Sequence, residues 1–389
     1  IIADSTSGSA ARGYTIHFLY LDEFAFVPNN IADEFFTSVY PTITSGTTSK
    51  VLISSTPNGM NHFYRIWKEA EEGINGFHYI EANWRQVPGR DEKWAAQQKR
   101  VLGEQKYMQE MECTFLGSAG TLISAAALKN MVFTRPIKEV LDGMEIYEEP
   151  QKNHFYVQVV DSSRGQGLDY SAFLIFDVSV EPFKIVAKYR NSTISPMLYP
   201  NVIVQAAKYY NEAYLLIENN DVGAQICDLT MNELEYDNMF HGYEGNGKYY
   251  LEQQGRTKEL GVKTTKRVKR QGCNTLKQLI ENNRMLINDF HIIEELSTFI
   301  LKRDGTYAGE EGSHDDLAMC CVLFAWLTAQ PYFKELTSFD VRQKLYSEKM
   351  QMIEDQMPVL PMTMDELAGN PKYFRSDGVV WETVDFNID

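Results

Sequence analysis

Two apolar segments of this chain each end in a single acidic residue, and this pattern limits the fold more than any other feature. The segment Phe155–Asp161 alternates in polarity and carries β-branched residues, and Ala213–Glu218 is almost wholly apolar, as is typical of strands. Further strands are expected at Ala172–Val178 and Lys184–Tyr189, and a helix near 195–211. This order predicts an α/β domain.

A long apolar helix is expected from about 315 to 329, and it begins with Asp315 and Asp316. If the strands that end in Asp161 and Glu218 are parallel neighbours, both acids lie at one edge of the sheet, where the first turn of the helix can join them. Carboxylates gathered so closely repel one another unless cations neutralise them. An oxygen-rich cluster predicts Mg²⁺ or Mn²⁺, and two such ions suit phosphodiester hydrolysis. Asp169, which enters the next strand, is a candidate auxiliary ligand.

Each acid also has a structural interpretation. Asp161 precedes the turn Ser162–Gly167, where Asp is common, and Asp315-Asp316 suits the start of a helix. Glu218 is harder to explain in this way, because an unpaired charge beside an apolar strand is costly. Taken together, the acids and the β-β-β-α-β-α order favour a ribonuclease-H-like nuclease domain.

A second acidic pair stands near the start of the chain, in Tyr20-Leu21-Asp22-Glu23. An apolar strand that ends in two acids has the form of a Walker B motif, in which one carboxylate holds Mg²⁺ and the next polarises the attacking water. A phosphate-binding loop comes earlier in such folds, yet the nineteen residues before Tyr20 contain no Gly-Lys-Ser/Thr. We therefore expect the chain to begin inside an ATPase domain. The alternative is that Asp22 and Glu23 only end a strand and open a turn.

The net charge of −16 argues against a polyanionic partner, but one segment departs from it. Residues 256–270 hold seven basic residues against the single acid Glu259, a local charge of +6. The basic residues are Arg256, Lys258, Lys263, Lys266, Arg267, Lys269 and Arg270. A solvated helix face is the usual explanation of such a run. Its place between Glu218 and the closing helix favours contact with a DNA backbone instead.

Composition sets the remaining limits. With 389 residues, 44% hydrophobic and 12% aromatic, the chain is expected to form two globular domains and a tail. There is no apolar run long enough to span a bilayer, no signal-peptide pattern, and no CxxC spacing among the five cysteines. We expect a protein of a reducing cytoplasm. The expected division is 1–118, a linker at 119–150, a nuclease domain at 151–335, and an acidic tail at 336–389.

The combined pattern resembles the large terminase subunit of tailed bacteriophages, particularly of the large contractile-tailed group. The resemblance covers about residues 5 to 330, and its motifs occur in one order across two domains. They are Tyr20-Leu21-Asp22-Glu23, Ser55-Thr56-Pro57-Asn58-Gly59, Gly120-Thr121-Leu122-Ile123, Asp161 with Arg164-Gly165, Asp169-Tyr170, Lys263 to Arg267, and His314-Asp315-Asp316-Leu317.

This resemblance implies the C-terminal half of a P-loop, RecA-like packaging ATPase domain followed by a ribonuclease-H-like endonuclease that cuts concatemeric double-stranded DNA. Asp22 would then hold Mg²⁺ and Glu23 would be the catalytic glutamate, with Ser55 and Thr56 in the element that couples hydrolysis to movement. Arg12 is a candidate nucleotide contact. Asp161, Glu218 and either Asp315 or Asp316 would bind the nuclease metals, and we favour Asp316.

The resemblance also implies partners: DNA, the portal protein, the small terminase subunit, and a pentameric motor ring on the prohead in the host cytoplasm. The chain departs from the family in lacking the Walker A part. ATP and Mg²⁺ are therefore expected to bind only with a complementing N-terminal half, either a separate polypeptide or a part removed. Two alternatives stay open: a non-catalytic motor component that binds DNA and the portal, and a ribonuclease-H-like transposase or resolvase.

Overall fold

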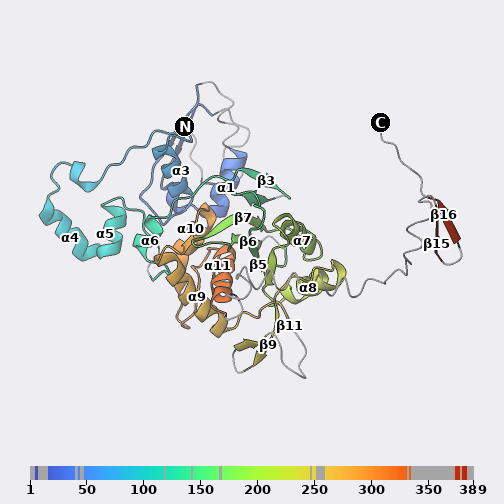
Figure 1. Ribbon diagram of the computed structural model, residues 1–389. Helices are drawn as coiled ribbons and strands as arrows, with labels where there is room; N and C mark the ends of the chain where they lie inside the picture. The colour runs from blue at the N-terminus through green and yellow to red at the C-terminus, as the bar shows by residue number, and fades with distance from the viewer. Residues whose placement is uncertain are drawn as a thin grey trace. The chain divides into compact units, whose positions relative to one another are not determined.

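A mixed sheet of seven strands forms the centre of the computed structural model. Its strands run in the order β3-β4-β7-β6-β5-β8 (Figure 1). The short strand β12 pairs in parallel with the first two residues of β7, Phe183 and Lys184. In chain order they are β3 (Lys138–Val140), β4 (Met144–Ile146), β5 (Tyr156–Asp161), β6 (Ser171–Asp177), β7 (Phe183–Asn191), β8 (Tyr214–Ile217) and β12 (Met285–Leu286). The strands β5, β6 and β7 are antiparallel neighbours, whereas β5 and β8 are parallel.

The structure describes residues 5–7, 16–39, 43, 48–117, 120–141, 143–165, 169–245, 248–250, 259–330, 333, 373–376 and 379–382. Contacts divide the chain into two units, 1–333 and 334–389. In the second unit the description covers an antiparallel hairpin of β15 (Tyr373–Ser376) and β16 (Val379–Glu382). Three residues with predicted roles, Arg12, Arg256 and Lys258, lie outside the described residues.

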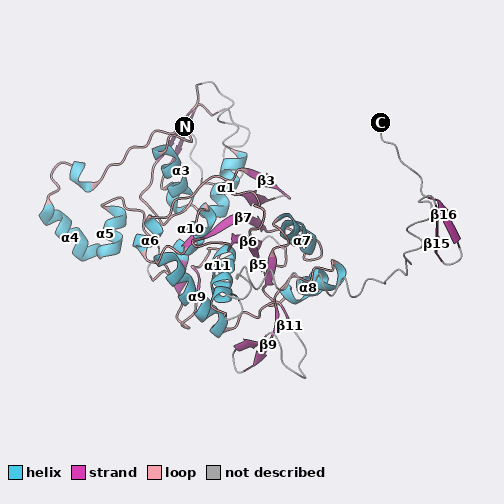
Figure 2. Ribbon diagram, viewed as in Figure 1, coloured by secondary structure: helices cyan, strands magenta, loops and turns pink. Residues whose placement is uncertain are grey.

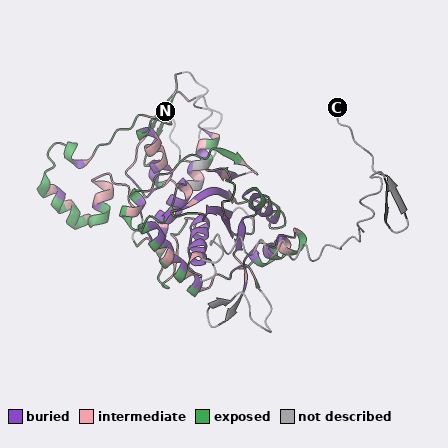
Figure 3. Ribbon diagram, in the orientation of Figure 1, coloured by how far each residue is buried: buried purple, intermediate pink, exposed green. Residues whose placement is uncertain are grey.

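Helices cover both faces of the sheet. On one face α7 (Tyr199–Tyr209) packs against Phe173 and Ile175 of β6 in a shared apolar cluster. On the other face lies α11 (Asp316–Thr328), where the Phe324 ring stacks on Phe176 of β6 with 3.8 Å between ring centroids. Figure 3 shows α11 and the central strands as the buried centre of this unit. Because side chains alternate along a strand, every second strand residue faces α11.

Two further helices, α9 (Lys266–Glu281) and α10 (Phe290–Thr298), pack beside α11. Figure 2 shows α9 as a helix, which begins at Lys266. Its start is set by Thr265, whose hydroxyl oxygen accepts a hydrogen bond from the Val268 amide at 3.3 Å. The basic residues from Lys266 onward therefore form the first turns of a helix.

The predicted linker at 119–150 contains regular structure. It includes the short helix α6 (Ala125–Lys129), and its later part forms β3 and β4, which extend the central sheet through β7. The charged residues of this segment form ion pairs, since Lys138 contacts Glu149 at 2.6 Å and Glu145 contacts Lys188 at 3.0 Å. Residues 138–146 are thus part of the sheet; the remaining domain boundaries stay predictions.

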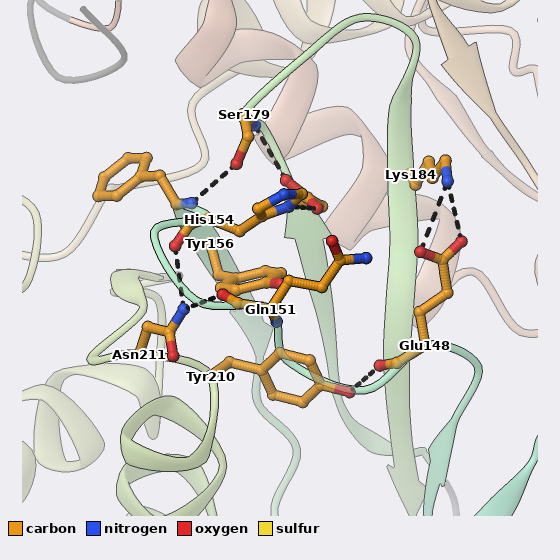
Figure 4. Close-up of polar contacts among 10 residues, drawn as sticks. Glu148, Gln151, His154, Tyr156, Ser179, Lys184, Tyr210 and Asn211 are labelled. Atoms are coloured by element: carbon orange, nitrogen blue, oxygen red, sulfur yellow. Dashed lines mark hydrogen bonds and ion pairs between the residues drawn. The ribbon is translucent and has the colours of Figure 1, made fainter. Parts of the chain in front are cut away.

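Polar contacts fix the chain where it enters β5 (Figure 4). The Asn211 amide, just after α7, donates to the carbonyl oxygens of Gln151 and His154, and the Tyr210 hydroxyl donates to the Glu148 carbonyl. His154 in turn lies 2.5 Å from an Asp177 carboxylate oxygen at the end of β6. These contacts hold the start of β5 against α7 and β6. Pairing with β6 and β8 then fixes the far end of the strand, where Asp161 lies.

The N-terminal part contains a parallel pair of strands, β1 (Phe18–Leu21) and β2 (Lys50–Ile53), as expected for an α/β sheet. One face of the pair packs against α1 (Asn29–Ser38) and α3 (His62–Glu71). The chain continues with α4 (Glu92–Leu102) and α5 (Glu104–Glu110). Smaller strands and helices complete the described chain: η1 (Phe24–Phe26), η2 (Trp84–Gln86), α8 (Gly223–Asp228), η3 (Leu229–Glu233), β9 (His241–Gly245), β10 (Lys248–Tyr250), β11 (Glu259–Leu260), β13 (Phe299–Leu301) and β14 (Tyr307–Gly309).

A buried ion pair joins the sheet to α10. The Lys188 ammonium of β7 lies 2.6 Å from the Asp289 carboxylate, which begins α10, and the Tyr147 hydroxyl donates to the same oxygen. Although burial opposes it, the charge of Lys188 and the contact with His291 hold the pKa of Asp289 well below its usual range. Both partners are buried, so removal of Lys188 would leave the Asp289 carboxylate buried without its lysine cation.

We expect Lys188→Met to lower the free energy of unfolding by about 3–5 kcal/mol, because the Asp289 carboxylate would stay buried without its cation. Urea denaturation at neutral pH measures this. Arg284→Met, which breaks an exposed ion pair with Glu181, is the control and should cost about 1 kcal/mol or less. Equal losses in the two variants would contradict this assignment.

Candidate functional site

The acids at the ends of β5 and β8 lie side by side. The two strands are parallel, with Val160 paired to Ile217, and the Glu218 amide donates to the Val160 carbonyl at 2.9 Å. The predicted meeting of Asp161 and Glu218 at one sheet edge is therefore confirmed. Alternation places both residues on the face that α11 covers, because Val160 and Ile217 belong to the apolar cluster on the opposite face.

The environment of Asp161 disfavours a negative charge. Burial, followed by the charge and a hydrogen bond of Glu218 and the charges of Asp316 and Asp315, raises the pKa of Asp161 well above its usual value. One carboxylate oxygen of Asp161 accepts the Ser162 amide at 2.8 Å, and Asn220 donates to Glu218 at 3.0 Å. Asp161 and Glu218 are thus held in place by neutral donors.

Asp316 and Asp315 have different surroundings. Asp316 is the first residue of α11, is only 6% exposed, and has one carboxylate oxygen without a hydrogen bond. Burial and the nearby charges of Glu295 and Asp169 raise the pKa of Asp316 to about 9. Asp315 instead accepts the Gly309 amide of β14 at 3.1 Å. This contact occupies one oxygen of Asp315 and supports Asp316 as the ligand.

A second group of potential ligands adjoins the first. Atoms of Asp169, His314 and Asp316 lie within 4.8 Å of one another. The Nδ1 atom of His314 is 3.6 Å from Asp169 and 3.8 Å from Asp316, and its ring meets the Tyr170 ring edge-on at 4.8 Å. The contact with His314 is the main cause of a lowered pKa of Asp169. Sequence reasoning did not select His314 as a ligand; its place directly before Asp315 was the available signal.

The donor set fits a divalent cation. Four carboxylates and one imidazole gather at the end of β5, and one Asp316 oxygen lacks a hydrogen bond. Burial, followed by the neighbouring acids, raises the pKa of both Asp161 and Asp316. Hard oxygen ligands with an imidazole suit Mg²⁺ and Mn²⁺. A cation at this place would remove the repulsion that the acids experience without one.

The start of α9 lies beside Glu218. Val262 forms an isolated parallel β-bridge with Glu218, and the Asn219 amide donates to the Val262 carbonyl at 2.8 Å. The chain reaches the first turn of α9 only a few residues later. Lys266, Lys269 and Arg270 line a small hollow there together with Gly305 and Thr306. Of the predicted DNA-binding residues, Lys263 directly follows the residue bridged to Glu218, and Lys266, Arg267, Lys269 and Arg270 lie on the first turns of α9.

The N-terminal acidic pair meets the end of β2. The hydroxyls of Tyr20 and Ser54 both donate to one oxygen of Asp22, at 2.9 and 2.8 Å, and their hydrogen bonds lower the pKa of Asp22. Ser55 donates to Glu23 at 3.4 Å and accepts the Ala25 amide. Glu23 has a φ of 49°, an uncommon left-handed conformation for this residue type. The predicted partners Ser55, Asp22 and Glu23 are thus brought together, and Ser54 is a contact that sequence reasoning missed.

Without metal, Asp316 should make stability depend on pH. The folded protein holds the Asp316 proton more tightly than an unfolded chain, in which the pKa of an Asp side chain has its ordinary value of 3.8. The resulting stability is complete below that value and is lost as the pH rises through about 9. In EDTA, the melting temperature of the wild type should fall between pH 5 and 9, and that of Asp316→Asn should fall less. Calorimetry with Glu311→Gln, an exposed acid, as control checks this; parallel curves for wild type and Asp316→Asn would contradict it.

Among the described residues, no helix is long and apolar enough to cross a membrane.

In comparisons with known proteins, two protein-family models match this chain. The model described as "Terminase large subunit, T4likevirus-type, N-terminal" matches residues 2–130, and the model described as "Terminase RNaseH-like domain" matches residues 158–325. They match in the order that the sequence motifs predict.

Curated proteins and solved structures similar to this chain include large terminase subunits. The large terminase subunit of Thermus phage G20c is 25% identical over 376 residues, covering 90% of this chain and 70% of the relative. That of Thermus virus P23-45 is 24% identical with the same coverage. The large terminase nuclease of phage G20c with bound magnesium is 20% identical, with a TM-score of 0.42, covering 54% of this chain and 97% of that one. Because two models of this family together match more than half of its residues, the chain belongs to the large terminase subunit family.

Proposed function

We propose that this chain cuts concatemeric double-stranded DNA during viral genome packaging, with two Mg²⁺ or Mn²⁺ ions held by Asp161, Glu218 and Asp316. The observation that carries the proposal is the meeting of these acids on the α11 face of the sheet. Asp169 and His314 would complete the ligand set on the side of Asp316.

Bound cations would supply a water of lowered pKa and charge stabilisation at the leaving oxygen. The chain's own residues provide the positions. The charges of both Glu218 and Asp316 act on Asp161, so these three acids would hold the cations together. Asn220 and the Ser162 amide orient the carboxylates through their hydrogen bonds.

DNA would approach along the start of α9. Lys266 and Arg270 are exposed and belong to the helix turn that follows Val262, the residue bridged to Glu218. Phosphates bound there would lie beside the acidic edge, and binding would depend on charge and not on base sequence. Lys263 and Arg267 extend the same surface.

The nuclease proposal is tested with single substitutions. We expect Asp161→Asn, Glu218→Gln and Asp316→Asn each to slow plasmid cleavage in Mn²⁺ by about 100-fold or more, because each removes a charged ligand. Asp315→Asn is the matched control and should retain most activity, since its contact is to Gly309. Gel assays of supercoiled DNA measure the rates.

An inactive wild type would support the alternative of a non-catalytic motor component that only binds DNA and the portal. Strand-transfer products would support a transposase or resolvase. If Asp315→Asn were inactive while Asp316→Asn kept its activity, the assignment of Asp316 as the metal ligand would be wrong.

The basic start of α9 predicts a change in salt dependence. Lys266→Gln and Arg270→Gln should each reduce the slope of log binding constant against log salt by about 1, as expected for one lost phosphate contact. Lys277→Gln, on the last turns of the same helix and paired with Glu281, should leave the slope unchanged. Fluorescence anisotropy with a double-stranded oligonucleotide measures all three slopes. Equal slopes in all variants would place the DNA elsewhere.

We further propose that Asp22 and Glu23 belong to an ATP-driven DNA-translocation motor. Their contacts with Ser54 and Ser55 support this, because the two strand ends that would hold Mg²⁺ and transmit movement are already linked by hydrogen bonds. Asp22 would hold the ion and Glu23 would orient the water, with Thr56 next in the coupling segment. From the family resemblance we propose as partners the portal protein, the small terminase subunit and further copies of this chain in a pentameric ring. The ring would assemble on the prohead in the host cytoplasm.

The motor proposal is tested by ATP turnover with an added polypeptide that carries a phosphate-binding loop, since this sequence has none. Glu23→Gln should lower turnover by about 100-fold or more while nucleotide binding persists, because the residue acts on the water. Glu34→Gln, an exposed acid of α1, is the control. Unchanged turnover in Glu23→Gln would exclude the role of Glu23.

A further inference from the structure

Behind the acidic cluster, Glu295 holds the first turn of α11 from a neighbouring helix. Glu295 belongs to α10 and is 3% exposed. Its Oε2 atom accepts the backbone amide of Ala318 at 2.9 Å. Ala318 follows Asp316 by two residues, so this hydrogen bond fixes the helix turn that carries the candidate ligand. The other oxygen, Oε1, has no hydrogen bond.

Arg190 provides the positive charge next to that oxygen. It extends from β7, is 16% exposed, and its guanidinium lies 3.8 Å from Oε1 of Glu295. The same guanidinium stacks on the Tyr170 ring, 3.8 Å from its centroid, and Tyr170 meets His314 edge-on. Arg190 therefore supports two candidate metal ligands indirectly. It contacts Glu295, which holds the turn of Asp316, and it contacts Tyr170, which packs against His314.

We infer that Glu295 and Arg190 are positioning residues of the metal centre, which fix Asp316 and His314 in the arrangement that binds a divalent cation. Neither residue is required to touch the ion. The inference rests on the proposed nuclease function and adds two residues that the sequence motifs do not contain.

The physical reason lies in the repulsion within the cluster. Asp161, Glu218 and Asp316 repel one another without a cation, so the helix turn that carries Asp316 needs support from outside the cluster. Glu295 gives this support by capping the turn, and Arg190 offsets the added negative charge of Glu295. A buried ion pair adds little stability over a well-packed apolar pair, so stability alone does not account for these two residues. Outer partners of metal ligands typically change metal affinity by about 10- to 100-fold when removed.

The test measures Mn²⁺ binding to the intact chain by electron paramagnetic resonance, which does not require cleavage. Glu295→Ala removes the cap, and we expect the Mn²⁺ dissociation constant to rise by about 10- to 100-fold. Glu295→Gln keeps an oxygen that can accept the Ala318 amide and should restore most of the affinity. Glu181→Ala, which removes an exposed ion pair with Arg284, is the control and should bind like the wild type.

A second pair of variants tests the cation. Arg190→Met should weaken Mn²⁺ binding, and Arg190→Lys should recover part of the loss because it keeps a charge beside Glu295. In cleavage assays, the Mn²⁺ concentration for half-maximal rate should rise in Glu295→Ala while the KM for DNA stays constant. Circular dichroism confirms that each variant is folded.

The outcomes separate the two proposals. If Glu295→Ala and Arg190→Met are folded and bind Mn²⁺ within about threefold of the wild type, the positioning roles are wrong, whether or not the wild type cuts DNA. If their Mn²⁺ affinity falls as expected while the wild type leaves DNA intact, the positioning roles stand and the nuclease function fails. A wild type that binds no Mn²⁺ overturns both.

Discussion

Electrostatic repulsion among carboxylates at one sheet edge is the constraint on which the rest of this structure depends. Asp161, Glu218 and Asp316 are brought together from two strands and a helix, and burial raises the pKa of Asp161 and Asp316. Such a cluster persists only if the surrounding fold is held independently of it. The stacked rings of Phe176 and Phe324 and the buried ion pair of Lys188 with Asp289 are interactions of that independent kind.

Much of this arrangement follows from local sequence signals. The alternation in Phe155–Asp161 and the apolar run before Glu218 determine strands, and a strand that ends in an acid determines which edge the acid occupies. Pairing of β5 with β8 then needed only the assumption that they are parallel neighbours. The start of the last helix at Asp316 was also readable, because the apolar run begins there. These features depend on residues close together in the chain.

The remaining features depend on partners far away in the sequence. Residues 119–150 were expected to be a linker, but β4 pairs with β7 and its acid Glu145 contacts Lys188 there. In the same way, Glu295 and Arg190 belong to none of the sequence motifs. Their contact with each other joins positions more than a hundred residues apart. No local pattern contains that information.

The burial of α11 has a mechanical consequence. Every residue from Asp316 to Leu327 is buried, packed between the sheet and the helices α9 and α10. A helix enclosed in this way cannot slide or turn without disrupting the interior. Asp316 is consequently the fixed reference of the acidic cluster. Any change in the spacing of the cluster must therefore come from Asp169 and His314, which lie outside the helix and are more exposed than Asp316.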